Sequence, residues 1–433
     1  MARNMKKSGK IWIGQIPENW KLVRLKNCSS LNGRIGWQGL KSTEFVDEGP
    51  FLITGTDFNN GYIDWNTCTH ITEKRYDEDE AIHIRENDIL VTKDGTVGKV
   101  AVAKNCPAQV SLNGGVLIVR NNRMIQYNDR FFYFLILSEE FRLWFNYYDN
   151  GSSTIKHLTQ EKFYNFCFAL PSIDEQVKIA HYLDEKCSRI DAVIDKTKDS
   201  IEEYKRLKQA VITQAVTKGI RGDRPMKDSG IDWIGEMPLN WRLIKIKWLL
   251  KERKDRSETG NEEPLSMSQK YGLIPTKDMD MIPNMAASFV GAKIVHEGDL
   301  VFNKLKAHLG VFSVSEYDGL VSPDYAVYYQ NYDVNLKFLE YLFKTSQYIS
   351  EFRKRSSGVG AGLTRLYTKD LYSIYCSLPS LEEQNEIVNY INCKTSEMNS
   401  IIDKKNHLIT ELETYKKSLI YEYVTGKKEV PSA

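Results

Sequence analysis

The amino-acid sequence predicts an α+β fold with two tandem domains of mixed α/β character, joined by two long helices. Three observations support this prediction. The chain has 433 residues, which is too many for one ordinary domain. Two stretches occur twice in the same order, and each copy of the second stretch has the spacing of a long amphipathic helix. We therefore expect a pseudo-twofold internal repeat whose long helices form an antiparallel coiled coil.

A short motif opens each half of the chain. Residues 8–26 align with residues 229–247 at a fixed offset of 221, and ten of the nineteen positions are identical. A second pair aligns residues 171–217 with residues 379–425 at an offset of 208, with seventeen of forty-seven positions identical. Two gapless matches in the same order indicate a tandem duplication.

The repeats and the helix breakers near Gly219 set the expected boundaries. We predict a first domain over 1–170 with its opening motif at 11–22, a central long helix over 171–219, a second domain over 220–378 with its opening motif at 231–243, a C-terminal long helix over 379–427, and a tail over 428–433.

Apolar residues recur at alternating spacings of four and three in both long helices, which is the pattern of a coiled-coil seam. Periodicity does not decide between parallel and antiparallel pairing, and each helix could instead pack on its own domain. We favour antiparallel pairing, because it lets two equivalent domains sit at opposite ends of one rod. The predicted seam is Leu183, Ile190, Ile194, Ile201, Val211, Ile391, Met398, Ile402, Ile409 and Leu419.

The segments 23–168 and 244–376 agree in pattern but scarcely in sequence. In the first, residues 88–102 read as two strands joined by a turn at Asp94-Gly95. A helix follows in each half, over 128–145 and 335–353. The repeat therefore combines shared scaffolding with divergent domains.

The composition, 42% hydrophobic and 27% charged, is that of a globular protein. Its longest apolar run, Phe131 to Leu137, is too short to span a membrane, and the N-terminus leads into no apolar stretch of signal-peptide length. Seven cysteines without a Cys-x-x-Cys pair fit a reducing compartment and no zinc site. We expect a cytoplasmic protein that binds no metal.

No catalytic residue is predicted. The glycines over 358–362 resemble a nucleotide-binding loop, but no strand–turn–helix pattern surrounds them. The chain contains no Asn-Pro-Pro-Tyr or Asp-Pro-Pro-Tyr stretch of an adenine methyltransferase and no phosphate-binding G-x-x-x-x-G-K-[ST] loop. Its seven histidines lack the spacing of metal ligands.

Basic and polar residues in the variable segments are candidates for DNA contacts. Arg and Lys match guanine, Asn and Gln match adenine, and hydroxyls reach phosphates. The candidates in the first half are Arg34, Trp37, Lys41, Thr54, Thr56, Lys93, Thr96, Lys99, Asn113, Ser152, Ser153, Lys156 and His157. Those in the second half are Lys251, Arg253, Lys254, Arg256, Gln269, Lys270, Asn303, Lys304, Lys306, His308, Arg353, Arg355 and Arg365.

Two motifs, one at the start and one at the end of each domain, resemble the specificity subunits of Type I restriction–modification enzymes. The opening motif, I-G-x-[IM]-P-x-x-W, occupies residues 13–20 and 234–241, and L-P-x-x-x-E-Q occupies residues 170–176 and 378–384. Residues 51–58 also look like the first-domain strand of that family. The second half departs there, with Pro-Leu-Ser-Met-Ser at 264–268, so its recognition surface is placed less securely.

The resemblance implies that each variable segment is a target recognition domain reading one half of a bipartite, asymmetric DNA site. The paired helices would then dock two methyltransferase subunits, and restriction subunits would join them. S-adenosylmethionine would bind to the methyltransferase subunits, ATP and magnesium to the restriction subunits, and no cofactor to this chain. The chain itself would be no enzyme.

Other interpretations remain open. The chain could serve a fused restriction–methylation enzyme that cuts on both sides of its site, a distinction that the sequence does not make. A coiled-coil scaffold that binds other proteins explains the helices but not two unlike domains in duplicated frames. An enzyme with an unrecognised site is the remaining alternative.

Overall fold

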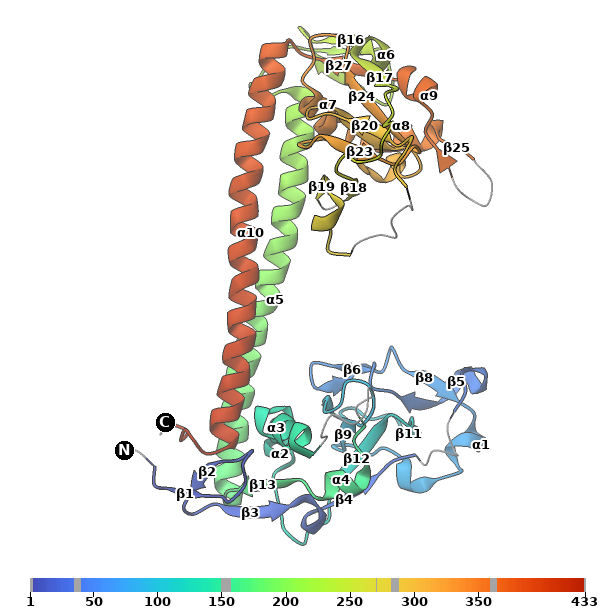
Figure 1. Ribbon diagram of the computed structural model, residues 1–433. Coiled ribbons are helices and arrows are strands. Elements are labelled where there is room, and N and C mark those ends of the chain that lie inside the picture. Colours follow the sequence, from blue (N-terminus) through green and yellow to red (C-terminus); the bar gives the residue numbers. More distant parts are fainter. Residues whose placement is uncertain are drawn as a thin grey trace. The chain divides into compact units, whose positions relative to one another are not determined.

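The computed structural model describes residues 3–34, 40–148, 157–269, 271–281, 288–358 and 364–431 (Figure 1). Its contacts divide the chain into two compact units. The first unit contains Met1–Thr197 and Asn406–Ala433, and the second contains Lys198–Lys405. Each long helix therefore contributes one part to each unit.

A two-stranded antiparallel hairpin opens each repeat. In the first unit β1 (Met5–Lys7) pairs with β2 (Gln15–Pro17), and in the second unit β14 (Met226–Asp228) pairs with β15 (Glu236–Pro238). The registers coincide after the offset of 221 residues. The repeated opening motif is thus a repeated local structure.

The same four-stranded antiparallel sheet forms the centre of both units. Its order is β4-β12-β9-β10 in the first unit, where β7 and β6 extend it, and β17-β24-β21-β22 in the second. The predicted strand pair around the turn at residues 94–95 is confirmed as β9 and β10. The remaining strands of the first unit form the groups β11-β5-β8 and β13-β3, and those of the second form β16-β27, β18-β19, β20-β23 and β25-β26.

The strands have the following bounds. In the first unit they are β3 (Lys21–Arg24), β4 (Ser29–Asn32), β5 (Phe45–Ile53), β6 (Phe58–Asn59), β7 (Tyr62–Ile63), β8 (Thr69–Ile71), β9 (Ile89–Thr92), β10 (Val100–Val102), β11 (Val110–Leu112), β12 (Val116–Asn121) and β13 (Cys167–Leu170). In the second unit they are β16 (Arg242–Lys245), β17 (Leu250–Arg253), β18 (Leu265–Ser268), β19 (Gly272–Pro275), β20 (Lys293–Val295), β21 (Leu300–Asn303), β22 (Phe312–Val314), β23 (Gly319–Val321), β24 (Tyr325–Gln330), β25 (Ser357–Gly358), β26 (Thr364–Arg365) and β27 (Tyr375–Leu378).

The helix predicted over 128–145 is two helices, α2 (Asp129–Leu137) and α3 (Glu139–Tyr148), so the prediction of one helix was wrong. Ser138 has an extended backbone between them, and its hydroxyl donates to the Leu135 carbonyl, which closes α2. The helix predicted over 335–353 breaks in the same way. The other shorter helices are α7 (Leu336–Phe343), α8 (Ser346–Arg355), α1 (Glu73–Tyr76), α4 (Gln160–Tyr164), α6 (Ile246–Leu249) and α9 (Thr368–Tyr372).

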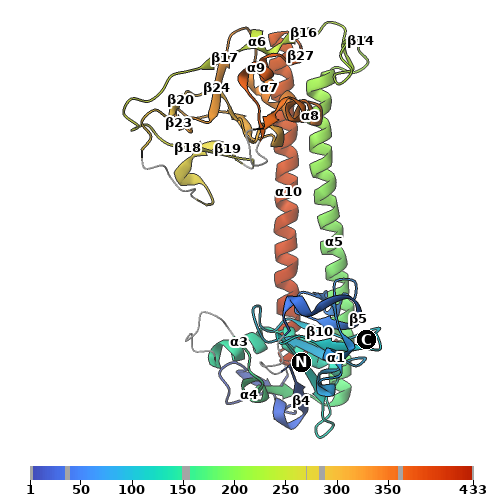
Figure 2. The same cartoon turned by 90° about the vertical axis from the view of Figure 1, so that its right-hand side faces the viewer.

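The two long helices are α5 (Ile173–Lys218) and α10 (Leu381–Val424), and they run side by side in each unit (Figures 1 and 2). Within each unit, partner numbers fall in α10 as they rise in α5, so the predicted antiparallel pairing is confirmed. The contacts are Asp191 with Lys416 and Tyr182 with Tyr423 in the first unit, and Lys208 with Asn399 in the second, where Arg221, three residues after the end of α5, pairs with Glu386.

Most of the predicted seam is buried. Leu183, Ile190, Ile194, Ile201, Ile391, Met398 and Leu419 are buried, and Val211, Ile402 and Ile409 are half-buried. Two lysines, one on each long helix, make polar contacts across the helix pair. Lys416 Nζ lies 2.6 Å from an Asp191 oxygen, and Lys208 Nζ lies 2.8 Å from the Asn399 oxygen. Such contacts favour one register of the pair.

A glutamine at the start of each long helix ties that helix to its domain. The Gln176 side chain accepts a hydrogen bond from the Asn128 backbone N–H (2.7 Å) and donates one to the Pro171 carbonyl (2.9 Å). Gln384 makes the two equivalent bonds in the second unit. Since Asn128 caps α2, the glutamine of the L-P-x-x-x-E-Q motif fixes α2 against α5.

The glutamate of the same motif binds the opening motif. In the first unit the Trp20 indole N–H donates to Glu175 (3.1 Å), and Arg3 pairs with the same carboxylate. Arg224 and Glu383 repeat the ion pair in the second unit. The two motifs therefore recur together because their side chains contact each other.

Candidate nucleic-acid interface

Three loops of the first unit meet where β5, β9 and β11 end. Backbone hydrogen bonds join them: the Asn113 N–H donates to the Ile53 carbonyl, and the Lys93 N–H donates to the Gly115 carbonyl, both at 2.9 Å. His157 joins this edge, because the next residue, Leu158, donates its N–H to the Lys93 carbonyl (2.8 Å). The predicted residues that the structure brings together here are Thr54, Thr56, Lys93, Thr96, Lys99, Asn113 and His157.

Several of these side chains already have partners. The Thr54 hydroxyl donates to the buried Asp57 carboxylate (2.9 Å) and lies 2.6 Å from the Thr56 hydroxyl. His157 pairs with Asp94. The edge is therefore an organised polar surface on which Thr56, Thr96 and Lys99 are exposed.

Arg34 and Lys41 do not lie at this edge. Arg34 is 2% exposed, and its guanidinium donates to the Leu112 carbonyl (3.1 Å) and to the Ser111 hydroxyl (3.2 Å). Burial chiefly, and the Arg75 charge next, lower its pKa. Arg34 thus fastens β11 inside the unit and is not presented to a ligand. Lys41 is exposed at the other end of β5.

In the second unit Asn303 ends β21, and the segment that leads to β22 carries Lys304, Lys306 and His308. Arg365 lies beside it, because the next residue donates its N–H to the Lys304 carbonyl (3.0 Å). Gln269 reaches the same loop, with its amide donating to the Leu309 carbonyl (2.8 Å). Arg365 also pairs with Asp324 at 2.8 Å.

Of the basic residues around β17, two arginines donate hydrogen bonds within the unit and two lysines are exposed. The Arg253 guanidinium donates two bonds to the buried Asp299, at 2.8 and 2.9 Å, and the hydrogen bond to Asp299 raises its pKa. Arg256 donates to the Gly291 carbonyl (2.6 Å). Lys251 and Lys254 are exposed.

Arg353 and Arg355 lie on α8. Arg353 is exposed, whereas Arg355 pairs with Glu351 (2.6 Å) and donates to the Ser373 hydroxyl (2.7 Å). Of the remaining candidates, Trp37, Ser152, Ser153, Lys156 and Lys270 lie outside the described residues.

The two edges are built on one scaffold. Lys93 directly follows β9 and Lys304 directly follows the equivalent strand β21. The Lys93 carbonyl accepts the Leu158 N–H, and the Lys304 carbonyl accepts the Leu366 N–H. His157 and Arg365 are then equivalent neighbours. Both edges have a lysine at this place, next to a residue that differs between them. Such a pair of sites is suited to ligands that have the same backbone but different attached groups.

Two buried aspartates, one directly before β9 and one directly before β21, were not predicted from the sequence. Asp88 pairs with Arg120 from β12, and Asp299, at the same position of β21, pairs with Arg253 from β17. The repeated Asp-Ile-Leu and Asp-Leu-Val strand starts were the available signal. The arginines could not be matched to them, because they come from different neighbouring strands.

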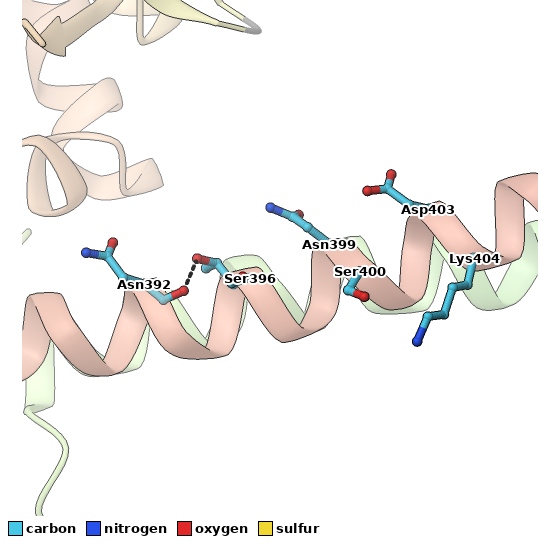
Figure 3. A pocket seen from close by; sticks show the side chains of 7 residues that line it. Asn392, Ser396, Asn399, Ser400, Asp403 and Lys404 are labelled. Carbon is cyan, nitrogen blue, oxygen red and sulfur yellow. Dashed lines mark hydrogen bonds between the residues drawn. The ribbon is translucent and has the colours of Figure 1, made fainter.

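A hollow on α10 is lined by that helix alone (Figure 3). Its residues are Asn392, Thr395, Ser396, Asn399, Ser400, Asp403 and Lys404. It lacks the apolar walls of a small-molecule site, so we interpret it as a solvated helix face.

Among the residues that the structure describes, no group of three His, Cys, Asp or Glu side chains is placed to hold a metal ion. No helix in the described ranges is both long enough and apolar enough to cross a membrane.

The two domains share a scaffold and present different polar edges. Comparison with known proteins shows what the chain is similar to. The sequence model described as "Type I restriction modification DNA specificity domain" matches residues 17–203. The type I restriction enzyme MjaVIII specificity subunit of Methanocaldococcus jannaschii is 23% identical over 96% of this chain and 94% of its own length.

Solved structures agree with the fold. A chain from a structure of the type I R-M system has a TM-score of 0.70 at 16% identity, covering 95% of this chain and 99% of that one. The HsdS subunit from Thermoanaerobacter tengcongensis has a TM-score of 0.52 at 16% identity, covering 95% and 98%. Residues 17–203 therefore match a type I restriction modification DNA specificity domain, and nearly the whole chain is similar to type I restriction enzyme specificity subunits.

Proposed function

We propose that this chain reads a bipartite, asymmetric DNA site, with the first variable segment reading one half and the second reading the other. The observation that carries the proposal is the pair of equivalent edges, at Lys93 in the first unit and Lys304 in the second, with different side chains around them. Unlike edges on one scaffold select unlike sequences, while the shared lysines fit the phosphates that every sequence has.

The chain supplies recognition, and other subunits supply the chemistry. In this proposal two methyltransferase subunits dock on the paired helices and use S-adenosylmethionine to methylate adenine. Restriction subunits with ATP and magnesium complete the complex. Methylation requires the base to rotate out of the duplex. In this proposal the methyltransferase performs that step, and this chain does not. We place the complex in the cytoplasm, together with its DNA.

The decisive experiment is methylome sequencing of cells that express the partner methyltransferase with and without this chain. We expect a split, asymmetric N6-methyladenine motif that disappears with the chain. A chain carrying both Lys93→Ala and Lys304→Ala is the matched variant, because it should fold and leave the motif unchanged but less completely methylated. If the methyltransferase is active and no motif depends on the chain, the proposal is wrong.

A further inference from the structure

A buried polar network lies next to the edge at Lys304 in the second unit. Glu252 on β17 accepts a hydrogen bond from Lys293 Nζ at 3.0 Å and another from the Thr368 hydroxyl at 2.7 Å. The Tyr328 hydroxyl lies 2.9 Å from the Thr368 oxygen. Lys293 is 6% exposed and Tyr328 is 1% exposed, so these hydrogen bonds form largely away from water.

The carboxylate sets the direction of the hydrogen bonds. An ionised carboxylate only accepts, so the Thr368 hydroxyl donates its single proton to Glu252, and the Tyr328 hydroxyl donates to the Thr368 oxygen. Burial would raise the pKa of Glu252, but the hydrogen bonds from Thr368 and Lys293 outweigh it, and the pKa is lowered. The Glu252–Thr368 hydrogen bond is therefore a charge-assisted link between β17 and the first residue of α9.

This link holds the segment that carries Arg365. Leu366, the next residue, donates its backbone N–H to the Lys304 carbonyl at 3.0 Å. The segment 365–368 is therefore bound to Lys304 near its start and to Glu252 at its end. Burial chiefly, and the Lys293 charge next, lower the pKa of Lys304, whereas the Glu252 charge opposes that shift. The network thus acts on both Lys304 and Arg365.

The first unit builds the equivalent place with apolar residues. Leu31 stands in β4 where Glu252 stands in β17, and each donates its backbone N–H to the hydroxyl of the tyrosine that ends α4 or α9, at 3.0 and 2.9 Å. Leu31 is 4% exposed and pairs across the strands with Val119, whereas Glu252 pairs with Tyr328. The scaffold therefore folds with an apolar pair at this place and does not require the charged one.

We propose that Glu252 and Thr368 are positioning residues for the second half of the DNA site, an inference that rests on the proposed function. They contact no base themselves. They hold Arg365 in one place beside Lys304, and a guanidinium distinguishes bases only when its donors meet the base edge in a fixed geometry. A segment that is anchored before binding also loses less conformational entropy on binding. The first half of the site should not depend on this link.

The test measures base preference in each half of the site for the full chain. Fluorescence anisotropy compares duplexes that carry the methylated motif with duplexes that have one mismatch in either half. Thr368→Val removes the hydroxyl and should reduce discrimination in the second half by roughly tenfold, which is within the range of one good contact between a side chain and a base. Discrimination in the first half should stay unchanged. Thr368→Ser retains the hydroxyl and should behave as wild type.

Two further variants separate positioning from stability. Thr345→Val is the matched control, because it is the same substitution at a buried threonine of the second unit, whose hydroxyl donates to the Leu342 carbonyl at 2.8 Å. It should lower the melting temperature and leave discrimination in both halves unchanged. Glu252→Gln decides the question if Thr368→Val does not fold. A carboxamide has one acceptor oxygen where the carboxylate uses two, so discrimination in the second half should fall here as well.

Unchanged discrimination in both Thr368→Val and Glu252→Gln would overturn the inference. An equal loss in the two halves, or an equal loss in Thr345→Val, would also overturn it, because the network would then act only through stability. A wild-type chain without base preference in either half would instead refute the proposed function, and this inference would fall with it.

Discussion

Glu140 in the first unit and Glu340 in the second are both buried in a helix, and their surroundings shift their pKa values in opposite directions. Glu140 in α3 is fully buried, and among the described residues neither of its carboxylate oxygens has a hydrogen-bond partner. Burial raises its pKa to about 8, although Lys427 opposes the shift. Glu340 in α7 accepts from Lys337 (2.9 Å) and Lys344 (2.6 Å).

Burial would raise the pKa of Glu340 as well, but the charges of Lys344 and Lys337 outweigh it, and the pKa is lowered. Among the described residues Glu140 has no hydrogen-bond partner, whereas Glu340 is paired with two lysines. The two glutamates do not occupy equivalent positions, because α3 corresponds to α8 and α7 corresponds to α2. The two units therefore share a backbone frame but differ in the charged groups that they bury. The two units should therefore respond independently to substitution.

The largest expected effect comes from exchanging residues 23–168 for the equivalent segment of another specificity subunit. Only one half of the methylated motif should change, and affinity for the original site should fall by about a thousandfold or more, since specific binding exceeds non-specific binding by at least that factor. Methylome sequencing checks the motif. A change in both halves would show that the units do not read independently.

Glu340→Gln should be the most damaging of the point substitutions. It leaves two lysines without their buried partner, and we expect a loss of about 2–4 kcal/mol in the free energy of unfolding at pH 7. Because the folded pKa of Glu340 is lowered, its contribution is present above the unfolded pKa and disappears as the pH falls through the folded value. Denaturant unfolding from pH 7 to pH 3 should show the penalty shrinking in acid.

Glu140→Gln should have the opposite sign. The folded pKa of about 8 lies above the unfolded value of 4.5, so wild type loses stability as the pH rises between them. The variant should be more stable by on the order of 2 kcal/mol at pH 8 and nearly equal to wild type below pH 4.5. The same unfolding series measures it. A gain that did not grow with pH would mean that Glu140 is ionised in the folded state.

The features that could be predicted from the sequence are the duplicated segments and the elements with regularly spaced apolar residues. The duplication, the two long helices and the β9–β10 strand pair follow from offsets and spacing, whereas antiparallel pairing was expected because it lets two equivalent domains sit at opposite ends of one rod. Ser138 was missed because a helical pattern continues across it, and one extended residue changes no periodicity. The burial of Arg34 and the pairing of Arg253 with Asp299 were missed because both depend on which distant strands become neighbours. Local pattern predicts elements, whereas a side chain's partner is a property of the tertiary fold.

The smallest expected effect tests what the two edges share. Lys93 and Lys304 occupy equivalent places, although the DNA halves that they would face differ in sequence. A residue that is constant across two specificities should contact what both halves have in common, which is the phosphate backbone. Lys93→Ala and Lys304→Ala should each weaken duplex binding by about 1 kcal/mol and reduce the salt slope by about one.

The base preference should stay the same in both variants, which a set of duplexes with single mismatches can measure by fluorescence anisotropy. Exchanging the neighbours instead, as in His157→Arg, should alter the base preference in one half and leave the salt dependence of the other half unaffected. If either lysine substitution changes the preferred bases, that lysine reads sequence, and the division between a constant phosphate contact and a variable base contact fails at that edge.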